Sequence, residues 1–137
     1  MGRRKENQDY KEILYNFLGG GSRWNHRLLC VHHINHNHGD NDAQNLLLMP
    51  VKMHSRYHYL YSVAMESCLL KKDLDGYFSI QRSKLEEFIA IKDDMCTLRH
   101  AQLEIHNMSR DLLSCGKQID GVGILVNVMG EIYNKYL

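Results

Sequence analysis

Histidines are unevenly spread along this chain. A single histidine is commonly a packed, hydrogen-bonded core residue, but seven within 33 positions need another explanation, and metal coordination is the usual one. The seven are His26, His32, His33, His36, His38, His54 and His58, and only His100 and His106 lie elsewhere.

Two pairs among these histidines have a spacing that suits metal chemistry. His54 and His58 are four residues apart in a segment expected to be helical, so both rings project from one face and could hold one cation. The same spacing also fits a polar helix face with two unrelated histidines. His32 and His33 are neighbours on an expected strand and must point to opposite sides.

One of these adjacent rings can therefore join the helical pair on a metal, while the other stays free. A free imidazole with a pKa near ~6.5 is the natural general base at neutral pH. Phosphodiester hydrolysis needs a base that activates water and a cation that stabilises the charge on the phosphate and the leaving oxygen. Asn45, between loop and strand, can bond backbone groups across the turn and fix where His33 stands, although alone it would be an ordinary turn residue.

The elements that position these residues follow from periodicity and turn chemistry. The sequence predicts a strand over 27–33, a turn-rich loop over 35–45, a strand over 46–49 and a helix over 51–70, with Pro50 in the first helical turn. These elements form a ββα unit. A helix over 6–18 precedes the unit and ends at a flexible joint, Gly19-Gly20-Gly21.

The remainder is expected to be mostly helical. Lys71 to Tyr77 contains Asp75-Gly76 and is interpreted as a connection. Ser83-Lys84-Leu85-Glu86 has the form of a capping box and should open a helix that runs to about Ser114. A last amphipathic helix is expected after Asp120.

Three short stretches resemble the motif of HNH endonucleases, particularly the small stand-alone phage and intron-homing members. They are Val31-His32-His33-Ile34, Asn41-Asp42-Ala43-Gln44-Asn45-Leu46 and His54-Ser55-Arg56-Tyr57-His58. The resemblance covers about residues 23–60. It implies an α+β fold with a ββα-metal core over 23–72, an N-terminal helix and joint over 1–22, and a mostly helical extension over 73–137.

The resemblance also implies roles. His33 takes the place of the general base, Asn45 that of the structural asparagine, and His32, His54 and His58 those of the metal ligands. It implies one divalent cation (Mg²⁺, Mn²⁺, Ni²⁺ or Zn²⁺) and cleavage of DNA, expected to be double-stranded. Contacts in this family go mainly to phosphates. Arg27, Lys52 and Arg56 are candidate phosphate contacts, and ordinary surface charge is an equally good interpretation. His36 and His38 are interpreted as solvated loop residues, and Tyr57 as a core residue.

Charge and composition fit this hypothesis. The formal net charge is only +1, yet residues 1–58 hold eight Lys/Arg against five Asp/Glu, so the half with the candidate site is the basic one. The four cysteines include no C-x-x-C pair, which argues against a disulfide scaffold and a cysteine zinc ribbon. No apolar run approaches the ~20 residues of a membrane span, so no membrane partner is expected. A cytoplasmic location is expected, in a bacterial host cell if the chain is phage-derived.

Two alternatives stay open. The chain could be a binding or inhibitor protein on the same scaffold, acting through residues 78–137 as a homodimer or on a protein partner. It could also hold a purely structural Zn²⁺, which requires a closed tetrahedral shell. Three protein ligands leave a position open, so the structural site is the least favoured of the hypotheses.

Overall fold

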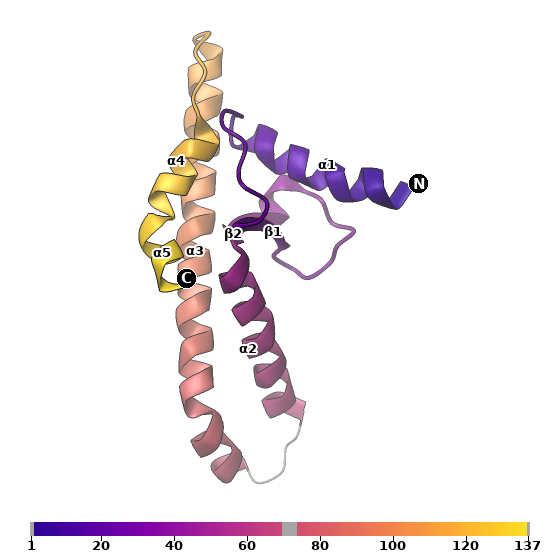
Figure 1. The fold of residues 1–137 in the computed structure, drawn as a ribbon, viewed down its shortest axis with the longest axis vertical. Coiled ribbons are helices and arrows are strands. Elements are labelled where there is room, and N and C mark those ends of the chain that lie inside the picture. Colours follow the sequence, from indigo (N-terminus) through magenta and orange to yellow (C-terminus); the bar gives the residue numbers. More distant parts are fainter. Residues whose placement is uncertain (1, 70–73, 137) are drawn as a thin grey trace.

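The chain folds into a mixed α+β structure that is mostly helical. The computed structural model describes residues 2–69 and 74–136. Within them, the chain forms five α-helices and one two-stranded antiparallel sheet (Figure 1). In chain order the elements are α1 (Gly2–Phe17), β1 (Leu29–His33), the short 3-10 helix η1 (Ala43–Asn45), β2 (Leu46–Pro50), α2 (Val51–Leu69), α3 (Leu74–Ser114), α4 (Gly121–Val128) and α5 (Gly130–Lys135).

The small sheet lies between α1 and α3 (Figure 1). Its register pairs Leu29 with Pro50 at one end and His33 with Leu46 at the other. All five residues of β2 are buried, as expected for an apolar strand covered on both faces. Pro50 is therefore the last residue of the strand, and not part of the first turn of α2 as the sequence had indicated, because it is paired with Leu29 in the register of the sheet and is buried.

A buried glutamine of α3 completes the outer edge of β2. The Gln102 side-chain oxygen accepts a hydrogen bond from the Leu48 N–H at 2.7 Å, and its side-chain nitrogen donates to the Leu46 carbonyl at 2.9 Å. A two-stranded sheet leaves such groups unpaired on each outer edge, and burying them unpaired is costly. Gln102, only 2% exposed, substitutes for a third strand at this point.

The predicted N-terminal helix is confirmed, and it extends further towards the N-terminus than expected. It is followed by three glycines in the left-handed region, Gly19 at φ 88°, Gly20 at 76° and Gly21 at 99°. A Cβ on Gly19 would lie 2.2 Å from Ser109 Oγ, and one on Gly21 would lie 2.1 Å from an Asp120 carboxylate oxygen. The segment predicted as a flexible joint is therefore a tightly packed turn that only glycine can form.

The connection predicted over 71–77 is wrong where the structure describes it, because α3 begins at Leu74 (residues 70–73 lie outside the described part). Ser83 consequently lies in the interior of a helix and does not cap one. One glycine costs only about 1 kcal/mol in a helix, less than the loss of hydrogen bonds from a break, so Gly76 does not interrupt it. Among the residues described, no helix is both long and apolar enough to cross a membrane.

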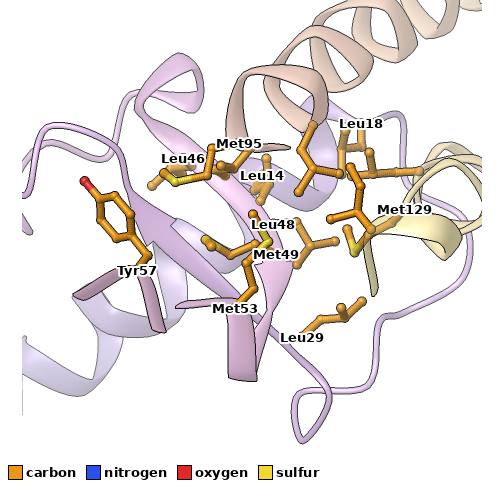
Figure 2. Packing of buried hydrophobic residues seen from close by; sticks show 14 of the residues in the cluster. Leu14, Leu18, Leu29, Leu46, Leu48, Met49, Met53, Tyr57, Met95 and Met129 are labelled. Atoms are coloured by element: carbon orange, nitrogen blue, oxygen red, sulfur yellow. The ribbon is translucent and has the colours of Figure 1, made fainter. Parts of the chain in front are cut away.

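Helices α2 and α3 pack as an antiparallel pair, and α4 and α5 lie along the other side of α3 (Figure 1). The expected last helix is present in two pieces, with a break at Met129. Side chains of α1, both strands, α2, α3 and α4 meet in one core (Figure 2), which includes Leu14, Leu48, Met53, Leu98 and Leu125. The face of β1 and α2 that carries the histidines is thus held against a continuous apolar base.

Candidate metal centre

Three histidines from two elements converge at one point. His32 comes from β1, and His54 and His58 come from successive turns of α2. His54 Nε2 lies 3.1 Å from His32 Nδ1 and 3.0 Å from His58 Nε2. One nitrogen from each ring falls within 4.8 Å of the other two. The structure thus brings together the three residues that the sequence predicted as metal ligands.

Burial favours the neutral form of these rings, most strongly for His32 and His54. His32 is 2% exposed, His54 is half-buried and His58 is exposed. Desolvation, followed by the charges of the other histidines, lowers the pKa of His32 to about 3 and that of His54 to about 4. The same causes lower the pKa of His58. Neutral imidazoles carry the lone pairs that a metal ion requires.

The donor set fits a divalent cation better than it fits hydrogen bonds alone. A neutral ring nitrogen has either one hydrogen or one lone pair, so His54 Nε2 cannot make a full hydrogen bond to both of its neighbours. Tetrahedral Zn–N bonds of about 2.0–2.1 Å would place the nitrogens about 3.4 Å apart, a few tenths of an ångström beyond the two separations that involve His54 Nε2. The other ring nitrogen of His32, Nε2, does not face His54 and is buried with no hydrogen-bond partner in the described part of the chain, which is rare in folded proteins.

His33 lies next to this cluster but contacts a different set of residues. Its Nε2 is 2.9 Å from Asn41 Oδ1, and its ring packs edge-on against Tyr10 of α1 at 5.2 Å and beside His38 at 4.8 Å. The ring is 5% exposed. Its charge contributes to lowering the pKa of His32, so the two sites are electrostatically coupled although they are separate.

Asn45 holds the loop between the strands. Its side-chain nitrogen donates to the Asp40 carbonyl at 2.8 Å and to Asn35 Oδ1 at 2.9 Å, and its side-chain oxygen accepts from the Asn35 N–H at 2.9 Å. These are the cross-turn bonds predicted for it. The side chain that bonds the His33 ring is that of Asn41, which the sequence interpretation placed in the motif without giving it a role.

Sequence reasoning missed the part that His36 and Tyr57 play at the site. His36 has φ 63°, the left-handed region that is costly for a residue with a Cβ. Its ring centroid lies 5.5 Å from those of both His32 and His58, and its Nε2 is hydrogen-bonded to the Tyr57 hydroxyl at 2.9 Å. His36 is therefore half-buried beside the cluster, and its interpretation as a solvated loop residue is wrong. The only feature of the sequence that could have indicated this position is that His36 follows His33 by three residues, across a turn.

The three predicted phosphate contacts differ in their surroundings. Arg27 is exposed in the turn before β1, and Lys52 is exposed in the first turn of α2. The Arg56 guanidinium makes two bonds to the Glu87 carboxylate of α3, at 2.9 and 2.6 Å. The Arg56 N–H donors that would bind a phosphate are therefore already paired with Glu87.

Comparison of the chain with protein-family models, curated proteins and solved structures returned no match. The site is consequently interpreted from its own geometry: three converging neutral imidazoles, with a fourth imidazole beside them on a separate hydrogen-bond network.

Proposed function

We propose that this chain is a metal-dependent endonuclease of the HNH type, with β1, β2 and α2 as a ββα-metal core, and that it hydrolyses phosphodiester bonds of double-stranded DNA. The observation that carries the proposal is that His32 and His33, although adjacent in sequence, contact two different sets of residues. One ring joins His54 and His58 in a three-nitrogen cluster, and its neighbour stands apart on Asn41. A hydrolase that uses water and one cation requires both arrangements.

His33 is assigned as the general base. Because an amide oxygen can only accept, the bond to Asn41 Oδ1 requires the hydrogen on Nε2, which leaves the lone pair on Nδ1. Nδ1 then takes a proton from a water molecule as the water oxygen bonds to phosphorus. The bond from phosphorus to the 3′-oxygen breaks, and the 3′-oxygen takes a proton from solvent. Following the family that the motif resembles, the products would carry 5′-phosphate and 3′-hydroxyl ends.

His32, His54 and His58 would hold the cation. When bound, a divalent cation supplies Lewis-acid stabilisation of the charge on the phosphate and on the leaving oxygen. The exposed ring of His58 gives this cluster an open side. Three protein ligands with an open position are typical of a catalytic site, whereas a structural zinc site is closed by four.

The direct test is cleavage of supercoiled plasmid by the purified chain in the presence of Mg²⁺, Mn²⁺, Ni²⁺ or Zn²⁺. Wild type should convert the plasmid to nicked or linear forms. His33→Ala should reduce the rate about 10²- to 10⁴-fold while the metal content stays unchanged. His54→Ala should lose both the metal and the activity. His100→Ala, a substitution of an exposed histidine of α3, is the matched control and should cut like wild type. A wild-type chain that cuts with none of these metals, or a His33→Ala variant that cuts equally well, would disprove the proposal.

A pocket on the opposite end of the sheet favours a second candidate, a binding protein on the same scaffold. It has a volume of about 570 Å³ and lies between the segment after the glycine turn and the helices α4 and α5. Trp24, Leu28, Val126, Met129 and Tyr133 are among the residues that line it. If plasmid is never cut and Val126→Asp abolishes a protein–protein or dimer contact seen by light scattering, this candidate replaces the nuclease.

A further inference from the structure

The surface beside the histidine loop is extended by α3. A hollow of about 410 Å³ is lined by loop residues that include Asn35, Gln44 and Asn45, and by Arg99 of α3. A second hollow of about 150 Å³ shares Ile34 and Arg99 with the first, and is also lined by Lys92 and Tyr57. Ile34 follows His33 directly, and the Tyr57 hydroxyl bonds His36. The two hollows adjoin at Ile34 and Arg99 and form one depression beside α3, next to the loop that follows β1. None of His32, His33, His54 and His58 lines it.

Two cations of α3 face this depression. Lys92 and Arg99 are seven residues apart, so they lie on the same face of the helix about 10.5 Å from one another along its axis. Both side chains are exposed. Lys92 lies over the Phe88 ring, with its Nζ 5.7 Å from the centroid. Among the described residues, no ion pair within 4.0 Å involves either of them.

The nearby carboxylates have ion-pair or hydrogen-bond partners. On α3, Glu87 pairs with Arg56, and Asp94 is bonded by Lys135 and Tyr136. In the loop, Asp40 accepts from the Asn35 side chain and from a backbone N–H, and Asp42 accepts from the Gln44 N–H. Asp40 and Asp42 line the first hollow and keep their negative charge, because their partners are neutral groups. On α3 itself, Lys92 and Arg99 are the charged residues that line the hollows, although residues 59–137 as a whole carry an excess of acidic residues.

We propose that Lys92 and Arg99 bind backbone phosphates of double-stranded DNA and guide one strand into the site. This inference rests on the proposed function, and it gives the helical extension a part in substrate binding. A separation of about 10.5 Å along α3 lets two long side chains reach different phosphates of one strand. Arginine offers a fork of N–H donors to phosphate oxygens, and lysine offers a compact charge. The exposed Gln44 amide adds an uncharged donor between the two elements.

The test measures binding without cleavage. A fluorescein-labelled 30-base-pair duplex is titrated with wild type in EDTA, over a series of salt concentrations, with fluorescence anisotropy as the readout. The variant Lys92→Ala/Arg99→Ala is compared with Arg110→Ala/Lys117→Ala, which removes two exposed cations at the same sequence spacing but away from both hollows. A third variant, Lys92→Arg/Arg99→Lys, keeps the charge. Circular dichroism establishes that each variant is folded.

The expected result is specific to position. Lys92→Ala/Arg99→Ala should weaken binding about tenfold or more at low salt. It should also reduce the slope of log affinity against log salt by roughly 1.8, or about 0.9 for each phosphate that the variant no longer neutralises. The decrease in affinity should be equal on duplexes of different sequence, because phosphate contacts carry no sequence information. The control pair and the charge-keeping variant should stay close to wild type.

Three results would overturn the inference: no duplex binding by wild type, unchanged binding by the alanine pair, or an equal decrease in the Arg110/Lys117 pair. The proposed nuclease function is judged separately, by plasmid cleavage and its dependence on His33. Binding that depends on Lys92 and Arg99 without any cleavage would remove the nuclease proposal and keep this surface. Cleavage that depends on His33, together with unchanged DNA binding by Lys92→Ala/Arg99→Ala, would keep the nuclease proposal and remove this surface.

Discussion

The hydrogen bond between His33 Nε2 and Asn41 Oδ1 decides which nitrogen of the ring can accept a proton. If that oxygen were removed, the imidazole could adopt either tautomer, and only one of them presents its lone pair at Nδ1. Asn41 is therefore a positioning residue under the proposed mechanism. It acts through His33 and is not one of the three histidines that form the cluster.

We expect Asn41→Ala to reduce the single-turnover cleavage rate about 10- to 100-fold, by analogy with the removal of groups that orient metal-site histidines. Metal affinity, measured by calorimetric titration with Zn²⁺, should stay within about twofold of wild type, because the cluster ligands are untouched. Asn107→Ala, an exposed asparagine of α3, serves as the control. An unchanged rate in Asn41→Ala would show that His33 does not depend on this bond.

The low pKa values of the cluster predict acid sensitivity in metal-free protein. The pKa of His32 falls to about 3 and that of His54 to about 4, from an ordinary 6.5, mainly because burial disfavours the charged ring. The unfolded chain therefore binds more protons than the folded chain once the pH drops below 6.5. The stabilisation is complete above pH 6.5 and is lost as the pH falls towards 4 and then 3.

Urea unfolding in EDTA should accordingly show a midpoint that decreases from pH 7 to pH 5, above the range where most carboxylates titrate. His54→Gln should flatten this dependence, and His100→Gln should leave it unchanged. A midpoint that is constant from pH 7 to 5 in the wild-type chain would contradict the assigned pKa shifts.

At the residue scale, the sequence was informative where spacing alone fixes geometry. The i, i+4 relation of His54 and His58 and the alternation of His32 and His33 are properties of a helix and a strand, so spacing predicted that one of the adjacent rings joins the helical pair. The family resemblance indicated that this ring is His32. His36 and Asn41 could not be assigned in this way, because they depend on a loop whose path includes a left-handed histidine and several side-chain bonds.

At the scale of elements, Gln102 links the long helix to the sheet. Its amide satisfies one donor and one acceptor of β2 that have no strand partner. β2 carries Leu46 opposite His33 and leads directly into α2. The position of the histidines therefore depends on a hydrogen bond made by a residue 56 positions from Leu46 in the chain.

Gln102→Leu should destabilise the fold by about 2–4 kcal/mol, because it leaves the Leu48 N–H and the Leu46 carbonyl buried and unpaired. The measurement is the free energy of unfolding in urea at pH 7. Gln118→Leu makes the same chemical change at an exposed position between α3 and α4 and should alter stability by no more than about 0.5 kcal/mol. Equal effects of the two substitutions would mean that the edge of β2 does not need Gln102.

Sequence periodicity predicted both strands, α1 and α2, and the end of α3 near Ser114, since each has a strong apolar pattern or a clear glycine stop. The start of α3 was predicted at Ser83, whereas the helix begins at Leu74. Local signals, Asp75-Gly76 and the capping-box pattern at Ser83, favoured a break that costs more hydrogen bonds than it saves in propensity. The role of Gln102 has no local signature, because a polar residue in a helix is ordinarily exposed.

At the scale of the whole molecule, the first helix is joined to the C-terminal helices. The turn after α1 contacts α4: the Ser22 N–H and hydroxyl both donate to the Asp120 carboxylate, and the Val122 N–H donates to the Gly20 carbonyl. The same carboxylate accepts from the Gly123 N–H at the start of α4. In consequence, α1, which places Tyr10 against His33, is held by the C-terminal helices as well as by the sheet.

The contact between the turn after α1 and α4 can be tested with substitutions of two glycines of the C-terminal helices. A Cβ at Gly121 would lie 1.6 Å from the Leu18 carbonyl oxygen and 3.1 Å from the Ile105 side chain, whereas a Cβ at Gly130 would meet nothing within 4 Å. Gly121→Ala should therefore cost about 3 kcal/mol or more, because backbone must move away from backbone. Gly130→Ala should be neutral or should stabilise by up to about 1 kcal/mol, since alanine favours the helix.

Thermal unfolding followed by circular dichroism distinguishes the two glycine variants, and amide hydrogen exchange locates the effect. If α1 and α4 form one cooperative unit, Gly121→Ala should lower protection in α1 together with α4, and Gly130→Ala should lower it in neither. A decrease in protection confined to α4 would mean that the cover over His33 is independent of the C-terminal helices. In that case α1 would be positioned by the sheet alone, and access to the candidate general base would not depend on the contact between the turn after α1 and α4.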